Sequence, residues 1–356
     1  MQAAWEEGNM RERFIIFLIL LFFICAHQVD FCADFFVTFK QIPEKKGEIR
    51  PVSTYSIVAY DQETDQLGVA VQSHWFSVGS VVPWAESGVG AVATQSFVEV
   101  SYGPLGLDLM RAGKSSEEAL RALVQADKNQ DVRQVGMVDA KGRVAVHTGK
   151  NCIAEAGHLV GDGFSCQANM MLKNTVWDAM AKAFQSTEGE LADRLVAALE
   201  AAQNEGGDIR GKQSAALIVV KGKSSGVWWK DRLFDLRIED HPAPIQELKR
   251  LLNLNKAYNH MNLGDEYLTD NKIEEAMKAY TKAMEMCPEN AEMIFWPAVT
   301  MAATGQVEKS LPLFRKVFAM DENWAILLPR LSKVGQFPED ETLIKKILSV
   351  APERKR

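Results

Sequence analysis

The sequence predicts an α+β protein in which two antiparallel sheets pack together, with helices on their outer faces, followed by a helical segment. Short β-branched runs separated by polar turns predict hairpins. Amphipathic helices come in pairs between these hairpins, whereas a doubly wound sheet alternates single strands with single helices. The segment from residue 256 onward is helical and repetitive. The two sheets and their helices are therefore expected to form one domain and the repeats another.

Composition is consistent with two globular domains. The chain has 356 residues, of which 47% are hydrophobic and 24% are charged, and this length exceeds what one small core can organise. The formal net charge of −7 argues against nucleic-acid binding, which needs an excess of lysine and arginine. Five cysteines are too few for a scaffold built on disulfides.

The N-terminal segment has the pattern of an export signal. Basic residues precede an uninterrupted apolar run at residues 14–26, which is shorter than the roughly 20 residues that span a bilayer. We expect a secretory signal peptide within residues 1–33, with translation starting at Met1 or Met10, and an uncleaved anchor is the alternative. Residues 34–53 form a polar spacer or propeptide. The protein is thus expected outside the cytoplasm, periplasmic or extracellular, and membrane-anchored if the leader is retained.

The segment from residue 54 to 252 carries the sheet and helix signals. Ser115 lies three residues before Glu118, which is the signature of a capping box at a helix start. Apolar residues at helical spacing mark two later helices. Residues 161–169 are expected to form a polar loop that leads into a helix. The expected strands and helices, in order, are strands 54–59, 67–71 and 89–96, helices 105–110 and 117–126, strands 134–138 and 143–147, helices 176–184 and 191–202, and strands 214–220 and 233–238.

Six short segments of this domain resemble a known family. In chain order they are similar to the domain of unknown function 1028, over about residues 54–252. The segments are Thr54-x-Ser56-Ile57-Val58-Ala59, Val78-Gly79-x-Val81-Val82-Pro83-Trp84-Ala85, Gly88-Val89-Gly90-Ala91-Val92-Ala93-Thr94-Gln95, Tyr102-Gly103-Pro104-x-Gly106-Leu107, Arg133-Gln134-Val135-Gly136 and Gly207-Asp208-x-Arg210-Gly211-x-Gln213-Ser214-Ala215-Ala216.

This resemblance implies a fold and a nucleophile. The family is similar in fold to the N-terminal-nucleophile hydrolases, which have a four-layer αββα sandwich, and it implies Thr54 as the first residue of the mature chain. A threonine in that position carries a hydroxyl and a free α-amine, and the amine can take the hydroxyl proton. No signal-peptidase site directly precedes Thr54, so a second processing step would be needed. The alternative is that Thr54 is an ordinary strand residue.

The expected chemistry around Thr54 departs from that of the proteasome. No lysine occurs between Leu67 and Ser96, although proteasome-type sites use a lysine from a neighbouring strand. The α-amine and neutral polar groups would therefore carry the proton. Side-chain amides that could donate to an oxyanion are expected from Gln95, Asn169 and Gln213, while Asn169 could instead cap a helix.

Several other residues are candidate binding groups, each with a structural alternative. His74 either lines a cleft or is a partly buried histidine. Ser96 and Ser214 are either site hydroxyls or small buried strand residues. Asp208 and Arg210 either stand at a pocket mouth, where the arginine would bind a carboxylate, or form a structural ion pair in a tight loop.

Neither a metal nor a cofactor is expected. Cys152, His158 and Cys166 lack the tight pairs and the fourth ligand of a zinc site. The two cysteines are expected either to form a disulfide, which an exported chain permits, or to remain free thiols. Residues 88–93 match a dinucleotide fingerprint only superficially, because a further strand rather than a helix follows.

Residues 256–356 resemble tetratricopeptide repeats. Gly264, Ala276 and Tyr280 fall where these repeats place small and aromatic packing residues. A shift of thirty-four residues brings Tyr280 to Phe314, and the pattern then fades. Such a segment provides either a peptide-binding groove or a docking and oligomerisation module, which would form a homo-oligomer.

The sequence thus favours an exported amidohydrolase or peptidase that acts on a small amide or peptide bond through Thr54. The alternative is a non-catalytic sandwich that binds a ligand while the repeats recruit a protein partner.

Overall fold

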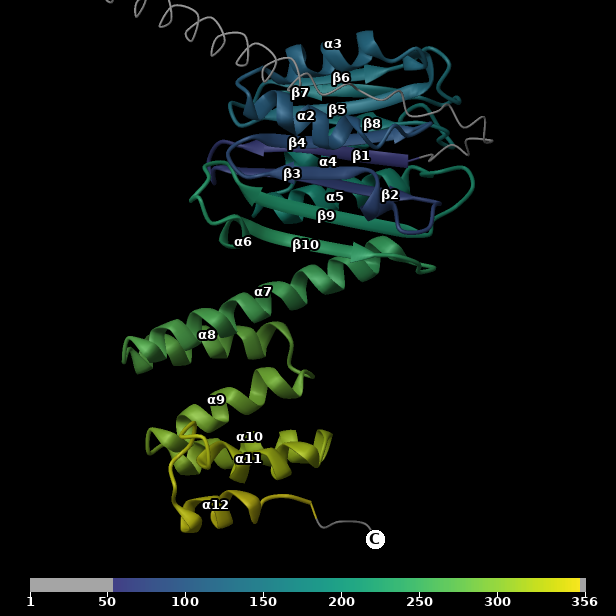
Figure 1. Cartoon of the computed structure of the whole chain (residues 1–356). Helices are drawn as coiled ribbons and strands as arrows, with labels where there is room; N and C mark the ends of the chain where they lie inside the picture. Colours follow the sequence, from purple (N-terminus) through teal and green to yellow (C-terminus); the bar gives the residue numbers. More distant parts are fainter. Residues whose placement is uncertain (1–53, 353–356) are drawn as a thin grey trace, which may run out of the picture. The chain divides into compact units, whose positions relative to one another are not determined.

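The computed structural model describes residues 54–352. The predicted leader and spacer at residues 1–53 lie outside the described residues, as do residues 353–356, which include the basic Arg354, Lys355 and Arg356. Two antiparallel sheets and their helices form the first part of the described chain, and six helices follow them (Figure 1). In this part of the chain no helix combines the length and apolar character needed to cross a membrane.

The larger sheet has six strands, and every neighbouring pair is antiparallel. The strand order is β10-β9-β2-β1-β8-β7, so β1 lies in the interior of the sheet with a partner on each side. Thr54 pairs with Ser73 at one end of β1, and Asp61 pairs with Gln66 at the other. The strands are β1 (Thr54–Asp61), β2 (Gln66–Ser73), β7 (Gly157–Gly161), β8 (Phe164–Ala168), β9 (Ser214–Lys221) and β10 (Arg232–Ile238).

The smaller sheet has four strands and packs face to face against the larger one. Its order is β3-β4-β5-β6, and apolar side chains from both sheets form one buried cluster between them, including Val58, Val69, Ala91, Val138 and Ile218. The strands are β3 (Pro83–Glu86), β4 (Gly90–Ser96), β5 (Arg133–Asp139) and β6 (Val144–Thr148).

Helices cover the outer face of each sheet. A buried cluster that includes Val92 and Met137 joins the smaller sheet to α2 (Tyr102–Arg111) and α3 (Ser116–Ala126). A second cluster joins the larger sheet to α4 (Val176–Ser186) and α5 (Leu191–Asn204). The predicted α+β class with antiparallel sheets is confirmed, as is the capping box, in which Ser115 and Glu118 bond reciprocally.

One sequence prediction is wrong. Residues 161–169 were expected to be a polar loop, but most of them lie in the hairpin of β7 and β8, which turns at Asp162 and Gly163. Gly163 has φ of 72°, which a glycine adopts without steric cost. Asn169 does not cap a helix, because α4 begins at Val176 after the N-cap residue Thr175.

The C-terminal helices pack in sequence, each on the one before it. The helix α7 is continuous across residues 252–256, where the domain boundary was expected. Its first half contributes Leu248 to the core of the sandwich, and its second half contributes Met261 to a separate cluster with Tyr280. The helices are α7 (Pro244–Thr269), α8 (Ile273–Met286), α9 (Ala291–Ala303), α10 (Val307–Met320), α11 (Asn323–Ser332) and α12 (Glu341–Leu348).

Candidate functional site

Thr54 begins β1 and faces the space between the two sheets. Side chains alternate along a strand, so Thr54 and Ser56 lie on the same face as Val58, which packs against the smaller sheet. Tyr55 and Ile57 face the helices instead. The layer between the sheets is therefore polar where β1 begins and apolar farther along.

Both the hydroxyl and the carbonyl of Thr54 are held by neighbouring strands. Thr54 Oγ1 donates to Ser73 Oγ at 3.2 Å, and both residues are fully buried. The Thr54 carbonyl accepts from Asn169 N at 3.1 Å and from Gln95 Nε2 at 3.2 Å. The side chain of Asn169 also approaches this carbonyl, with Nδ2 at 3.4 Å. The start of β1 is thus fixed from both sheets.

Gln95 and three further polar side chains extend this contact into a buried network. Ser56 Oγ donates to Gln95 Oε1 at 2.6 Å and accepts from Gln167 Nε2 at 2.7 Å. Gln95 Nε2 donates to Gln134 Oε1 at 2.8 Å, and Gln134 Nε2 donates to Ala168 O at 2.9 Å. These contacts join β1 and β8 of the larger sheet to β4 and β5 of the smaller one. Because each amide has partners in a water-poor space, the network is rigid.

A glycine makes room for this network. A Cβ atom on Gly136 of β5 would lie 2.5 Å from Gln167 Oε1, so the amide of Gln167 occupies the space that a side chain would take. The network consists of hydroxyls, amides and carbonyls. The arrangement can hold a neutral nucleophile in place, and it would disfavour a charge there.

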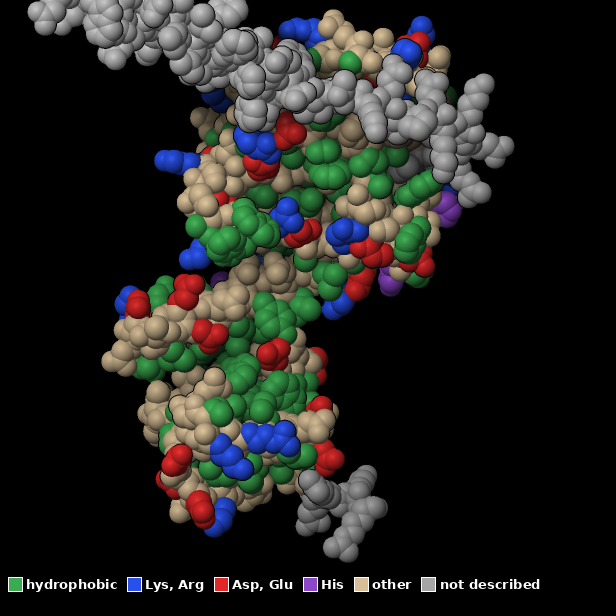
Figure 2. Space-filling view, viewed as in Figure 1, with side chains coloured by type: hydrophobic (Ala, Val, Ile, Leu, Met, Phe, Trp, Pro, Cys, Tyr) green, Lys and Arg blue, Asp and Glu red, His purple; other side chains and the backbone are tan. Residues whose placement is uncertain are grey.

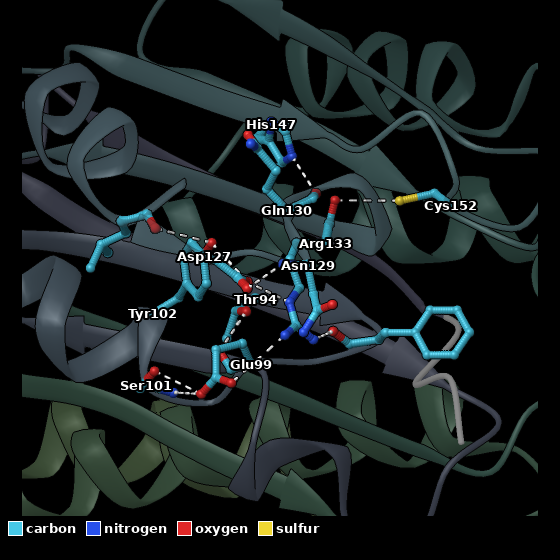
Figure 3. Close-up of polar contacts among 12 residues, drawn as sticks. Thr94, Glu99, Ser101, Tyr102, Asp127, Asn129, Gln130, Arg133, His147 and Cys152 are labelled. Carbon is cyan, nitrogen blue, oxygen red and sulfur yellow. Dashed lines mark hydrogen bonds and ion pairs between the residues drawn. The ribbon is translucent and has the colours of Figure 1, made fainter. Parts of the chain in front are cut away.

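The opposite face of the same strand ends carries a charged cluster (Figure 3). Arg133 Nε bonds Asp127 Oδ2 at 2.7 Å, and Arg133 Nη2 lies 3.9 Å from Glu99 Oε2. Burial by itself would raise the pKa of the Asp127 carboxyl, but the hydrogen bonds from Arg133, Asn129 and Tyr102 and the charge of Arg133 together outweigh it, and the pKa is lowered. Burial and the charge of Asp127 raise the pKa of Tyr102, which bonds Asp127 at 3.2 Å. The cluster fixes the ends of β4 and β5 that carry Gln95 and Gln134.

Asp208 and Arg210 form a structural ion pair. Arg210 contacts the Asp208 carboxylate through Nε at 3.1 Å and through Nη2 at 2.9 Å, and the carboxylate is fully buried. Asp208 Oδ2 also accepts from the backbone N–H of His74 at 3.2 Å, which ties the loop after β2 to the loop before β9. The His74 side chain is exposed.

The side chains of Gln213 and Ser214 have partners outside the Thr54 network. Gln213 Nε2 donates to Asp240 Oδ1 at 3.0 Å on the exposed side of its loop. The buried Ser214 accepts from Val78 N at 3.1 Å and fixes the loop after β2. Ser96 is buried at the end of β4 with φ of 71°, on the face opposite to Gln95. Of the predicted site residues, the structure therefore brings together Thr54, Gln95 and Asn169.

Four members of the network were not predicted from the sequence: Ser56, Ser73, Gln134 and Gln167. Each is a polar residue in or at the end of an apolar run, and each occupies the inter-sheet side of its strand. A polar residue on the side of a strand that faces the other sheet is therefore the signal by which these four could have been found. It requires the strand pairing to be known, and β8, which carries Gln167, had not been predicted as a strand.

The cysteines of the described chain are free thiols, so the free-thiol alternative is confirmed over the disulfide. Cys166 faces the helices outside the larger sheet, whereas Cys152 Sγ contacts Arg133 O at 3.3 Å (Figure 3). Burial raises the pKa of the Cys152 thiol. His158 bonds Thr148 at 2.9 Å, and among residues 54–352 no group of three His, Cys, Asp or Glu side chains could hold a metal ion.

A polar hollow of about 810 Å³ lies at the opposite end of β1 from Thr54. Its lining includes Tyr60 and Asp61 at the end of β1, Phe184 of α4 and Arg194 of α5. Arg194 lies 3.7 Å from Asp61 and over the ring of Phe184, so its charge is already compensated. This hollow is separate from the Thr54 network.

Comparison with known proteins gives the family. The model of a family of unknown function, DUF1028, matches residues 54–248, and the chain belongs to this family. Its structure is similar to the crystal structure of protein SPO2555 from Silicibacter pomeroyi, which matches the same family model. The two are 29% identical, with a TM-score of 0.51, over 56% of this chain and 84% of that one. No match to a curated protein is found. The resemblance to the domain of unknown function 1028 is confirmed, and it brings no reaction with it.

Proposed function

We propose that the chain is an exported amidohydrolase or peptidase of the N-terminal-nucleophile type, which acts on a small amide or peptide bond. One observation carries this proposal. Thr54 is the first residue of an interior strand and faces the layer between two sheets, where the Thr54 carbonyl is held by Gln95 and Asn169. Helices on both outer faces make this arrangement similar to the αββα sandwich of such hydrolases.

The chemistry follows from a free α-amine on Thr54. In a buried space lined by neutral groups, desolvation lowers the pKa of an amine, which keeps it unprotonated and able to act as a base. Thr54 Oγ1 attacks the amide carbon while the α-amine takes the hydroxyl proton. The C–N bond then breaks, and the proton passes to the leaving amine. Water hydrolyses the resulting ester and restores the hydroxyl.

The amides have a positioning role in this scheme. The N–H groups of Gln95 and Asn169 donate to the Thr54 carbonyl and to Gln134 Oε1, so they orient the nucleophile. Ser73 Oγ accepts a hydrogen bond from the Thr54 hydroxyl at 3.2 Å, which makes Ser73 the second group that positions the nucleophile. The network contains no charged side chain that could pair with a charged substrate, so a neutral amide is the favoured substrate.

The helices after residue 256 are proposed to be tetratricopeptide-like repeats that bind a protein partner. Gly264 of α7 packs directly against Tyr280 of α8, and a Cβ atom at Gly264 would lie 2.3 Å from the Tyr280 ring. Phe314, thirty-four residues after Tyr280, is likewise buried in α10. These contacts occupy the positions that the repeat pattern assigns to small and aromatic residues.

The test combines the mass of the mature chain with two threonine variants. We expect the mature chain to begin at Thr54, and Thr54→Ala to lower hydrolysis of a responsive amide in a substrate panel by at least about 10³-fold. Thr94→Ala is the matched control, since Thr94 is also a buried strand threonine but contacts Glu99 O. A mature chain that retains residues before Thr54 would leave no free amine and would favour the ligand-binding alternative. Equal activity of Thr54→Ala and Thr94→Ala would refute the proposed nucleophile.

A further inference from the structure

The loop between β9 and β10 presents two adjacent tryptophans to solvent. Trp228 and Trp229 lie in α6 (Trp228–Asp231), and 69% and 65% of their surfaces are exposed. Hydrophobic side chains gather at the place of α6 in the space-filling view (Figure 2). Exposing two large aromatic side chains is unfavourable for a protein in water. The loop at residues 222–231, called the tip below, therefore needs an explanation.

A buried carboxylate holds the tip in place. Asp231 accepts from Ser225 N at 2.8 Å, from Ser224 Oγ at 3.1 Å and from Ser87 Oγ at 3.0 Å, and Lys221 Nζ lies 3.3 Å away. The hydrogen bonds from Ser225 hold the pKa of the Asp231 carboxyl well below its usual range. The exposed tryptophans therefore belong to a fixed turn.

The tip is basic although the chain is acidic overall. Lys223 and Lys230 flank the tryptophans, and no acidic partner for either lies among residues 54–352. The other nearby cation, Arg232, is paired with Asp235. Acidic residues Glu63 and Asp65 occupy the neighbouring β1–β2 turn, and Asp65 accepts the hydroxyl of Tyr60. Two uncompensated lysines beside two indoles match the charge of an anionic surface.

The geometry of the two indole rings distinguishes a lipid surface from a sugar as the partner. The two indoles stand edge to face, with centroids 5.9 Å apart and planes at 89°, so they do not form the flat platform on which a sugar ring would stack. Tryptophan is favoured at the water–lipid interface, and lysine is attracted to anionic headgroups. We infer that Trp228 and Trp229, with Lys223 and Lys230, dock the protein onto an anionic lipid surface.

This contact would orient the sandwich. Lys221 at the end of β9 pairs with Gln66, whereas Ser214 at its start pairs with Ser73, the neighbour of Thr54. The tryptophan tip therefore lies at the opposite end of the sheets from Thr54. A docked molecule would hold its Thr54 end away from the lipid.

The test uses the full chain and vesicles of phosphatidylcholine with or without phosphatidylglycerol. The predicted leader carries Trp5 and could itself bind lipid. The measurement is therefore the difference between the unmodified chain and Trp228→Ala/Trp229→Ala in the quenching of tryptophan fluorescence by brominated acyl chains, which reports the loop. We expect quenching of the unmodified chain on phosphatidylglycerol vesicles and loss of most of it in Trp228→Ala/Trp229→Ala. Lys223→Glu/Lys230→Glu should weaken vesicle binding by at least about thirtyfold. The control Phe76→Ala, which removes an aromatic that is 65% exposed at the other end of the sheets, should change neither.

Three outcomes would overturn the inference. One is equal quenching in the unmodified chain and the double tryptophan variant. Another is quenching that does not depend on phosphatidylglycerol or on the lysines. The third is a change of oligomeric state in lipid-free solution on replacing the tryptophans, measured by sedimentation, which would show that a second copy of the chain covers the tip.

Discussion

Replacing Gln95 by leucine tests whether the inter-sheet amide network stabilises the fold. Gln95 is fully buried; its carbonyl accepts from Ser56, and its amide nitrogen donates to Thr54 O, Gln134 Oε1 and Gln167 O. In Gln95→Leu the hydroxyl of Ser56 loses its acceptor. The Thr54 carbonyl and Gln134 Oε1 each keep a donor from Asn169.

The magnitude follows from counting these partners. One orphaned buried hydroxyl costs about 1–3 kcal/mol, and each hydrogen bond whose acceptor keeps another donor is worth roughly 0.5–1.5 kcal/mol. The apolar surface that leucine gains offsets about 1 kcal/mol. We therefore expect Gln95→Leu to lower the free energy of unfolding by about 2–4 kcal/mol, measured by urea denaturation of the full chain with circular dichroism.

Gln72→Leu is the matched control. Gln72 of β2 is also fully buried, but within the described residues neither atom of its amide has a hydrogen-bond partner. Removing that amide breaks no hydrogen bond, so Gln72→Leu should leave the stability unchanged or raise it. The reasoning is refuted if the two variants lose equal stability, or if Gln95→Leu costs less than about 1 kcal/mol.

Two further predictions concern packing and pH. Gly264→Ala should lower the melting temperature, because the new Cβ would lie 2.3 Å from the Tyr280 ring. Relieving that overlap costs about 1–3 kcal/mol, which exceeds the gain in helix propensity of about 1 kcal/mol. A rise in Tm would contradict this. Asp127→Asn should lower stability at neutral pH by about 2 kcal/mol, because it breaks the pair with Arg133. The pKa of Asp127 is lowered in the folded chain. Its contribution to stability is therefore fully present above the pKa of an aspartate in the unfolded chain, about 4, and is lost as the pH falls through the lower pKa of the folded chain. Urea denaturation near pH 7 and near pH 3 should therefore show a smaller difference between unmodified chain and variant in acid, and a constant difference would contradict the assignment.

The local signals predicted most of the fold. The β1–β2 hairpin, the paired helices and the capping box at Ser115 depend on short-range patterns, which are visible in one sequence. The β7–β8 hairpin was missed because polar residues Ser165 and Gln167 occupy the inter-sheet side of β8. Residues 164–168 do alternate apolar and polar residues, as in a strand with one solvent-facing side. Here the polar side is buried too, and only the partners supplied by distant strands make that burial favourable.

The candidate site was predicted in part for the same reason. Thr54, Gln95 and Asn169 stood out by position or by resemblance, and they meet in the structure. Gln134 belongs to the same network, but its role depends on the pairing of β5 with β4, which no local pattern specifies. The opposite case is Gln213, which has a suitable side chain but bonds Asp240 on the outside of its loop.

The interior position of β1 has a consequence for how a threonine could come to stand at the N-terminus. Thr54 pairs with Ser73 on one side, and its carbonyl is bonded by Asn169 on the other. A protease that shortens the chain residue by residue can remove only backbone that is not bound in a sheet. The folded sheet would then set a limit that trimming cannot pass, so that Thr54 and the residues after it stay in the mature chain.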